Sequence, residues 1–300
     1  MSALRRAVEE YLTLRQRLGA RLRGVASGLR AFTRFASHEG ASHVTIDVAL
    51  RWATLSEGSH LVTVASRLRM VRVFAQWRQA IDPRTEVPPA DLVHARYRRK
   101  RPYLYSDEEV ARLIRAARRL PSAGGLRGLT YATLFGLLAV TGMRVSEVVA
   151  LDGADIKLDD GVLVIRRSKF RKSRLVPVHA STRKNLEDYA ANRDRLLPRL
   201  KAAAFFVSEK GTRITHWAAR YTFAKVSGQI GLRPPIRGPR HGHGPRLHDL
   251  RHRFAVRTLV DWYRAGIDAE RALPQLATYL GHVHVNQTYW YLEAAYSGPS

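Results

Sequence analysis

Cysteine is absent from the sequence, and acidic residues are scarce. Without cysteine the chain forms no disulfide, offers no thiolate to a metal and has no thiol nucleophile. Its 25 Asp+Glu face 51 Lys+Arg, which gives a formal net charge of +26. A chain this basic repels itself unless a polyanion neutralises it. The imbalance therefore makes a nucleic acid the first partner to expect.

Long apolar runs are missing as well. The longest, near Tyr131–Val140, is too short to span a bilayer and predicts a buried helix instead. The first residues, MSALRRAVEEYLTL, contain no apolar stretch of the signal-peptide type. We therefore expect a cytoplasmic, nucleoid-associated protein with no membrane partner.

The positive charge is spread over the whole chain. Residues 1–100 hold 18 basic and 8 acidic residues, and the remaining residues hold 33 and 17. A single basic tail on a neutral enzyme would not give this distribution. A general preference for arginine explains why only 8 of the basic residues are lysine, but it does not explain the shortage of acids.

Residues 1–94 are predicted to form a helical domain. Apolar residues recur there at helical spacing, over Leu4–Leu18, Leu22–Phe35, Val48–Leu55 and Val62–Ile81. A short basic linker, residues 95–103, follows and is predicted to lie along a phosphate backbone, although a solvated loop would have the same composition. The residues assigned to this DNA contact are Arg98, Arg99, Lys100 and Arg101.

Residues 104–300 are predicted to form a second domain, in which helices surround a few strands. Ser106 and Glu109 have the spacing of a capping box, which predicts the start of a helix. The strands are expected at Ile156–Leu158, Val162–Ile165 and Leu175–Val178. The other helices are expected at Thr130–Thr141, Ser181–Leu197, His216–Ile230, Leu247–Ala265 and Ala269–Leu280, with a last one holding Tyr289–Ala295. The predicted fold class is mainly α with a small antiparallel β-sheet.

The segment Thr141–Glu147 contains the first candidate for phosphate chemistry. Gly142 is predicted to end one helix and Arg144 to begin the next, beside unpaired backbone N–H groups that suit phosphate oxygens. A guanidinium at that position binds two phosphate oxygens at once. An ordinary salt bridge between Arg144 and Glu147 explains this motif alone equally well.

A basic hairpin is predicted around Ser168–Val178. A lysine at its tip, Lys169, is placed to protonate a leaving oxygen, and a basic tip is suited to reach a DNA groove. The residues assigned to DNA contacts here are Arg171, Lys172 and Arg174. The alternative for such a run of charge is a solvated turn.

Two further motifs add histidine, arginine and tyrosine. His248 and Arg251 are three residues apart and so share one face of a predicted helix, although a lone histidine on a helix is more often structural. Gly281 is suited to cap a helix and leave His282 at its end. Tyr291 lies in the cluster Tyr289–Tyr291, and a phenol attacks phosphorus once its proton is removed. The alternative for that cluster is core packing, which we expect for two of its three aromatic residues.

This set resembles the active site of the tyrosine recombinase, or phage integrase, family, and its Xer-like mobile-element branch is nearest. The residues that carry the resemblance are, in order, Arg144, Lys169, His248, Arg251, Gly281, His282 and Tyr291. The likeness covers about Leu104–Glu293, and chance rarely produces this set in this order. It implies a two-domain, C-shaped clamp, with a helical, SAM-like core-binding domain before a catalytic domain. The match of the helical part rests on pattern alone.

The resemblance implies a role for each member of the set. Tyr291 attacks the scissile phosphate and forms a 3′-phosphotyrosyl bond. Arg144 and Arg251 bind the non-bridging oxygens, and His282 adds a hydrogen bond. Tyr289 and Tyr296 compete with Tyr291 for the role of nucleophile, but the family spacing from the Gly-His pair favours Tyr291.

Two proton transfers are also implied by the resemblance. Lys169 protonates the departing 5′-oxygen, and His248 assists proton transfer to and from the tyrosine. Lys172 competes with Lys169, but the first lysine of the hairpin fits the family pattern better. Because these cations neutralise the phosphate without a metal and the phosphotyrosyl bond conserves the bond energy, we expect no metal and no cofactor.

The resemblance further implies a homotetramer that acts on double-stranded DNA with paired recombination sites, with accessory recombinases as optional partners. Many relatives continue beyond the nucleophile into a longer segment that docks on a neighbouring subunit. Only residues 292–300 follow Tyr291 here, so we expect that exchange to be short or absent.

Three rival hypotheses remain at this stage. A zinc site is suggested by the spacing of His241-x-His243, His248-x3-His252 and His282-x-His284, but no set of cysteines or carboxylates completes it. A type IB topoisomerase would share the chemistry but relax supercoils without pairing two sites. A DNA-binding accessory protein on the same fold would form no covalent adduct.

Overall fold

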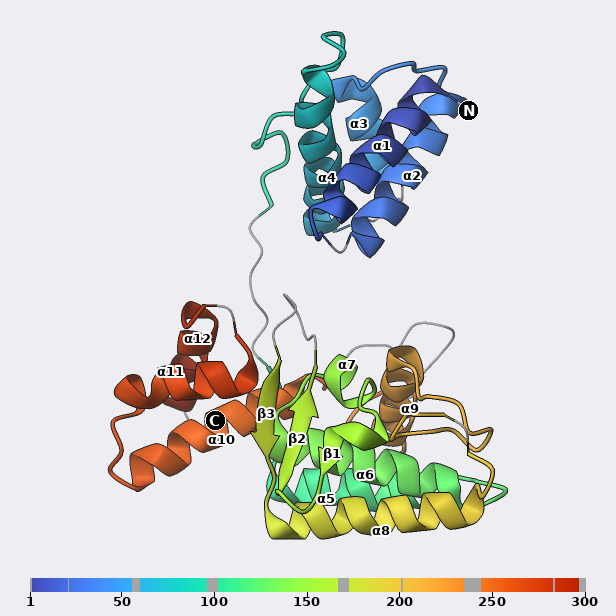
Figure 1. Cartoon of the computed structure of the whole chain (residues 1–300). Coiled ribbons are helices and arrows are strands. Elements are labelled where there is room, and N and C mark those ends of the chain that lie inside the picture. The colour runs from blue at the N-terminus through green and yellow to red at the C-terminus, as the bar shows by residue number, and fades with distance from the viewer. Residues whose placement is uncertain are drawn as a thin grey trace. The chain divides into compact units, whose positions relative to one another are not determined.

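The computed structural model describes residues 2–20, 22–55, 60–95, 102–166, 173–200, 202–234, 244–282 and 284–296. The chain divides into two compact units, Met1–Lys100 and Arg101–Ser300 (Figure 1). Among the described residues no helix is both long enough and apolar enough to cross a membrane.

The first unit is a bundle of four helices: α1 (Ala3–Arg17), α2 (Arg23–His38), α3 (Ile46–Thr54) and α4 (Leu61–Gln79). Three of them begin at side-chain caps: Ser2 accepts a hydrogen bond from the N–H of Arg5, Thr45 accepts one from that of Val48, and His60 accepts one from that of Val62. One apolar stripe of each helix faces a shared core, in which Phe32, Trp52 and Phe74 are buried.

The segment that follows α4 is fixed to this bundle by hydrogen bonds. Arg72 on α4 donates from Nε to the carbonyl of Pro88 at 2.8 Å and from Nη2 to that of Pro89 at 3.0 Å. The carboxylate of Glu86 accepts the N–H of Ile46 at 2.7 Å, at the start of α3. The proline-rich stretch therefore belongs to the first unit.

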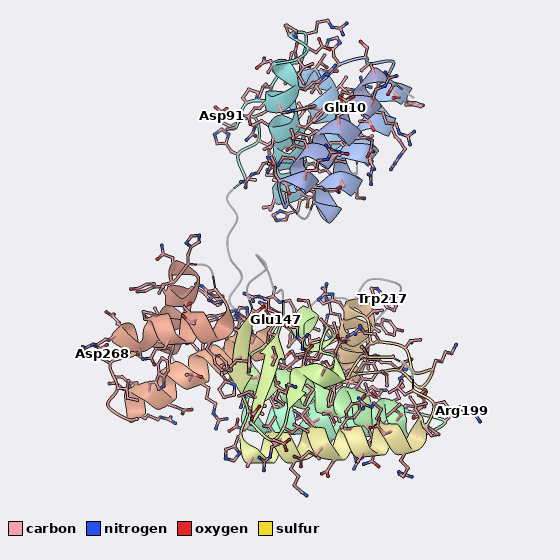
Figure 2. The ribbon with its side chains drawn as sticks, viewed as in Figure 1. Glu10, Asp91, Glu147, Arg199, Trp217 and Asp268 are labelled. Atoms are coloured by element: carbon pink, nitrogen blue, oxygen red, sulfur yellow. The ribbon has the colours of Figure 1, made fainter. Side chains whose placement is uncertain are left out.

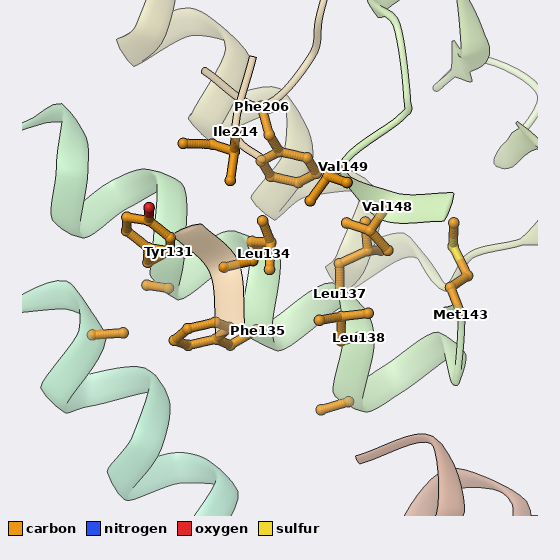
Figure 3. Close-up of a cluster of buried hydrophobic side chains, with 14 of the residues drawn as sticks. Tyr131, Leu134, Phe135, Leu137, Leu138, Met143, Val148, Val149, Phe206 and Ile214 are labelled. Atoms are coloured by element: carbon orange, nitrogen blue, oxygen red, sulfur yellow. The ribbon is translucent and has the colours of Figure 1, made fainter. Parts of the chain in front are cut away.

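The second unit is built around a helix that is apolar on nearly every side, α6 (Leu126–Thr141). Around it lie α5 (Asp107–Arg118), α7 (Val145–Val148), α8 (Ala180–Leu196) and α9 (His216–Gln229). Figure 3 shows its side chains Leu134, Phe135 and Leu138 packed with residues from α7 and from the segment before α9. This is the larger hydrophobic core of the unit.

A three-stranded antiparallel sheet lies against the same core. Its strands are β1 (Ile156–Lys157), β2 (Val162–Ile165) and β3 (Arg174–Pro177), in the order β1-β2-β3. Leu163 pairs with Val176, and both side chains are buried. A short 3-10 turn, Gly153–Asp155, precedes the sheet.

A smaller, separate core joins the last three helices, α10 (Asp249–Arg264), α11 (Ala269–Leu280) and α12 (Asn286–Tyr296). Its centre contains Leu259, Leu273 and Leu280, and Tyr291 of α12 packs among them. In Figure 1 these helices stand to one side of the sheet, and α11 approaches β3. The second unit therefore has two cores, and the end of α11 lies near the place where they meet.

The predicted fold class, mainly α with a small antiparallel sheet, is confirmed. The capping box at Ser106 and Glu109 is also confirmed, since both of its hydrogen bonds are present. The helix predicted to begin at Arg144 is present as the short α7, whereas the 3-10 turn was not predicted, because three residues carry no periodic signal. Helix α6 begins at Leu126, earlier than expected.

Candidate active site

The turn from α6 to α7 sets the position of Arg144. Gly142 ends α6 in the left-handed conformation, at φ 59°, and a Cβ at this position would overlap the ring of Phe254. Both requirements select glycine. Two residues later, Arg144 is the N-cap of α7, as the sequence predicted.

Arg144 is tied to two partners and remains partly exposed. Its Nη1 donates to Oε1 of Glu147 at 2.8 Å, and its Nη2 donates to the carbonyl of Gly281 at 2.9 Å. The backbone N–H of Arg144 also donates to Glu147, at 2.9 Å. The salt bridge that sequence reasoning offered as an alternative is therefore present, while 20 % of the side chain stays accessible.

Glu147 is the buried anion that orders this region. Arg174 at the start of β3 donates to both of its carboxylate oxygens, at 3.0 and 2.8 Å. Burial alone would raise the pKa of Glu147, but the hydrogen bonds and charge of Arg174, with those of Arg144, lower it from 4.5 to about 2. Figure 2 shows Glu147 beside the sheet, at the end where β3 begins. The carboxylate therefore stays charged at any ordinary pH.

Arg174, which was predicted to contact DNA, faces inward in the structure. Besides its two bonds to Glu147, its Nε donates to the carbonyl of Tyr279 at 2.7 Å. Only 12 % of the side chain is exposed. Its donors are directed at the protein interior, so in this position Arg174 orders the buried carboxylate. Sequence reasoning read its charge as part of a basic tip and could not see the buried carboxylate.

Arg251 is more deeply buried, at 2 % exposure. Its Nη1 donates to the carbonyl of Gly142 at 2.9 Å, and its Nη2 donates to that of Leu280 at 2.8 Å. Burial, and next the repulsion of Arg144, lower its pKa from 12.5 to about 10, so it is still a cation at neutral pH. The side chain therefore links the end of α6 to the end of α11.

His282 completes the link. Its Nε2 lies 2.9 Å from Nη2 of Arg251, and its Nδ1 lies 2.7 Å from Oγ1 of Thr288. A guanidinium only donates, so in the neutral ring Nε2 is the acceptor and Nδ1 carries the proton. Gly281 before it adopts φ 68° as the cap of α11, which confirms the predicted glycine cap.

Helix carbonyls explain why cations gather here. The last carbonyls of a helix lack intrahelical partners and carry partial negative charge, which favours cations beside them. Arg144, Arg174 and Arg251 all bind carbonyls at the ends of α6 or α11. Arg144 and Arg174 share the one carboxylate of Glu147, and Arg251 adds a third cation beside them, so the cluster keeps a net positive charge suited to a phosphate.

His248 lies at the start of α10, one turn before His252. Its ring meets that of His252 edge to face, with centroids 4.8 Å apart, while part of its surface stays in solvent. Burial of its inner side, together with the charge of Arg251, lowers its pKa below the ordinary 6.5. The ring is therefore neutral at physiological pH and able to accept a proton.

Tyr291 is buried, at 2 % exposure, whereas Tyr289 on the same helix is 49 % exposed. The Tyr291 hydroxyl lies 3.0 Å from Nδ1 of His252, and its ring stacks on His282 with centroids 6.2 Å apart. Core packing holds for two of the three aromatic residues of this cluster, as expected, because Tyr291 lies in the smaller core, Trp290 packs against it and Tyr289 is exposed. The candidate nucleophile is itself one of the two packed residues.

The structure thus brings Arg144, Arg251, His282 and Tyr291 into one connected cluster, and His248 joins it through His252. Several other predicted site residues lie outside the described residues, namely Lys169, Arg171, Lys172 and Arg98–Arg101. Within the described part of the chain, no three His, Cys, Asp or Glu side chains gather as a metal site requires.

Sequence reasoning gave neither Glu147 nor His252 a place in the site. Glu147 was considered only as an alternative salt-bridge partner of Arg144, and His252 only as part of a zinc-site spacing. The shortage of acidic residues in this very basic chain could have pointed to Glu147. An acidic residue close to a candidate arginine in such a chain is expected to form an ion pair with that arginine.

Comparison with known proteins gives the class of the molecule. Residues 104–297 match the model of the phage integrase family, and the chain belongs to that family.

Individual relatives align over nearly its whole length. The integrase/recombinase protein y4rB of Sinorhizobium fredii is 47 % identical over 296 residues, which are 97 % of this chain and 93 % of that protein. Tyrosine recombinase XerD of Neisseria meningitidis serogroup B is 29 % identical over 290 residues, covering 95 % and 91 %.

Solved structures share the fold at lower identity. A lambda integrase dimer bound to a COC′ core site superposes with a TM-score of 0.65 at 17 % identity, covering 96 % of this chain and 76 % of that one. The Tn1549 transposon integrase in complex with transposon right end DNA gives 0.64 at 16 % identity, covering 97 % and 94 %.

Proposed function

We propose that this protein is a site-specific DNA recombinase, or integrase, that cleaves and rejoins strands through a 3′-phosphotyrosyl bond at Tyr291. The observation that carries the proposal is the joining of Arg144, Arg251 and His282 around the ends of α6 and α11, with the ring of Tyr291 stacked on His282. A net positive cluster beside a phenol is what phosphoryl transfer to tyrosine needs.

In the proposed reaction the Tyr291 oxygen attacks phosphorus, and the bond from phosphorus to the 5′-oxygen breaks. Arg144 and Arg251 hold the non-bridging oxygens, where charge develops, and His282 orders Arg251. Phosphoryl transfer depends mostly on positioning and on neutralised charge. The 5′-hydroxyl of a second strand then attacks the phosphotyrosyl bond and releases the phenol.

Two protons move in this scheme. His248 takes the phenol proton during attack, which its lowered pKa supports because the ring is neutral near pH 7. Lys169 gives a proton to the departing 5′-oxygen. Since the phosphotyrosyl bond conserves the energy of the phosphodiester, the reaction needs no nucleotide cofactor and no metal.

The proposed substrate is double-stranded DNA with paired recombination sites. The net charge of +26 supports binding to a polyanion, with Arg98–Arg101, Arg171 and Lys172 as proposed backbone contacts. A structural neighbour is described as a lambda integrase tetramer bound to a Holliday junction. We propose a tetramer on two duplexes for this chain as well, which also predicts affinity that falls steeply with salt.

Covalent capture tests the proposal. A nicked suicide substrate is made from the DNA that flanks the gene in its genome, and the SDS-resistant adduct is measured. The wild-type protein should form the adduct, Tyr291→Phe should bind the DNA and form none, and Tyr289→Phe should match the wild type. An adduct with Tyr291→Phe would assign the nucleophile elsewhere. If the wild type binds but never crosslinks, a non-catalytic DNA-binding role would replace the proposal.

Strand exchange between two duplexes then separates recombination from topoisomerase activity. A recombinase should yield products that join arms of different duplexes. Relaxation of supercoiled DNA without such products would favour the topoisomerase hypothesis.

A further inference from the structure

The proposed nucleophile is in contact with a histidine that the proposed mechanism does not use. His252 is 5 % exposed and its Nδ1 lies 3.0 Å from the hydroxyl of Tyr291. The ring of Trp290 packs edge-on against the same imidazole, with centroids 5.3 Å apart. Phenol and imidazole thus form a buried pair between α12 and α10.

One face of α12 is docked on the smaller core. Thr288, Tyr291 and Leu292 are all buried, and their spacing puts them on a single side of the helix. Thr288 lies against His282 and Tyr291 against His252, so each meets a histidine of the cluster. Tyr289 points to solvent from the other side. The docking of α12 therefore fixes where the phenol lies.

A DNA phosphate cannot reach a phenol that is 2 % exposed, and Arg251, at the same exposure, must likewise become accessible before it contacts the phosphate. The phosphodiester is bulky and charged, and attack requires the hydroxyl within about 3.5 Å of phosphorus. Tyr291 must therefore leave its present position before it reacts, and the contact with His252 must break. Any free energy that this contact contributes to the closed position opposes cleavage.

We propose that His252 is a positioning residue that holds Tyr291 in a closed resting position, so that release of this hydrogen bond precedes DNA cleavage. The inference rests on the proposed function, since it assumes that Tyr291 is the nucleophile. His252 follows Arg251 directly on α10, so one helix turn carries both a phosphate-binding cation and the resting partner of the phenol. A phosphate that engages Arg251 is thereby positioned to disturb the closed pair.

Two substitutions separate the hydrogen bond from the packing. His252→Phe keeps an aromatic ring of similar size but loses Nδ1, whereas His252→Asn keeps a polar group near the Nδ1 position and loses the ring. Single-turnover cleavage of the suicide substrate at saturating DNA should be faster in His252→Phe by about twofold to tenfold, the usual effect of one net hydrogen bond. His252→Asn should stay near the wild-type rate.

A chemical measurement checks the closed position without any activity. Nitration of tyrosines by tetranitromethane, followed by mass spectrometry, reports which phenols are accessible in the protein without DNA. Tyr291 should react slowly in the wild type and faster in His252→Phe. Tyr289, which is exposed, and Tyr189, which is 1 % exposed in α8, supply a fast and a slow internal reference in every sample.

Three results would overturn the inference. A slower cleavage rate in His252→Phe with normal His252→Asn would mean that His252 acts on the hydroxyl in the reacting state. Equal rates in all three proteins would mean that the contact does not hold the phenol back. Nitration of Tyr291 in the wild type as fast as that of Tyr289 would mean that no closed position exists. Failure of the proposed function is distinct, since the wild type itself would then form no adduct.

Discussion

The two sides of the candidate site are built in different ways. On the arginine side, Arg144, Arg174 and Arg251 are held by Glu147 and by helix carbonyls from two separate parts of the unit. On the tyrosine side, the proposed nucleophile, Tyr291, lies on the last described helix and is buried against His252. The arginine side is held by bonds to several separate elements, whereas the phenol is held by the docking of one helix. Because Arg251 and Tyr291 are each 2 % exposed, both must become more accessible before they contact a phosphate.

This difference suits an enzyme that must not cut DNA at random. A preorganised cluster of cations binds phosphates wherever they occur, and electrostatic binding carries no information about sequence. If the nucleophile were equally ready, any bound phosphodiester would be at risk. A closed phenol adds a step between binding and cleavage, and that step can depend on a correctly assembled complex.

Loss of an arginine should produce the largest effect. In Arg251→Ala the single-turnover cleavage rate should fall by about 10² to 10³, as when one oxyanion donor is removed. Leaving the carbonyls of Gly142 and Leu280 without this donor should also destabilise the fold. Rapid-quench assays measure the rate, and DNA binding serves as the control. A rate within tenfold of the wild type would remove Arg251 from the phosphate-binding side.

The second-largest effect is expected from removing the charge of Glu147, the carboxylate that pairs with Arg144 and Arg174. Glu147→Gln should lose roughly 2 kcal/mol of stability, because hydrogen bonds to a charged group are replaced by weaker ones. The pKa of Glu147 is about 2 in the folded protein against an ordinary value of 4.5, so its contribution to stability is complete above pH 4.5 and is lost as the pH falls from 4.5 toward 2.

Urea unfolding at a series of pH values measures this. The wild type should lose stability more steeply than Glu147→Gln over that acid range, and the two curves should converge as the pH falls. Parallel curves would show that Glu147 is not held ionised by Arg174 and Arg144.

The smallest effect, a loss of stability, is expected from adding a side chain at the crowded position Gly281. Gly281→Ala suffers left-handed strain at φ 68°, and its Cβ would lie 2.9 Å from Nη1 of Arg174. Gly266→Ala is a matched control, since its φ is 72° and nothing lies within 4 Å. Each should lose about 1 kcal/mol from strain, with a further loss only in Gly281→Ala. Equal midpoints of denaturation in the two variants would mean that the arginines move aside freely.

Local signals in the sequence predicted the frame of this molecule well. The capping box at Ser106, the glycine ends at Gly142 and Gly281, and the periodicity of α10 and α11 depend on residues a few positions apart. Contacts over long separations could not be read in that way. The hydrogen bond from Tyr291 to His252 joins residues 39 positions apart, and that from Arg144 to Gly281 joins residues 137 apart.

The partner of Arg174 could not be read from composition. Within a run of basic residues its charge suggested a DNA-binding tip, and only the folded sheet reveals that it begins β3 and pairs with the carboxylate of Glu147. The motif Arg144, His248, Arg251 was found because its residue types and order are themselves distinctive. The burial of Tyr291 had no such signal, because a buried and an exposed tyrosine look alike in a sequence.

The carbonyl groups at the end of α11 give the site one more property. Arg144 and Arg174 come from the side of the larger core, and they grip Gly281 and Tyr279, which belong to the helix of the smaller one. The cation cluster thus connects the larger and the smaller core of the second unit by hydrogen bonds. A ligand that binds this cluster should slow amide hydrogen exchange in α11 and α12 together. Mild denaturant should abolish activity at concentrations below those that unfold either core.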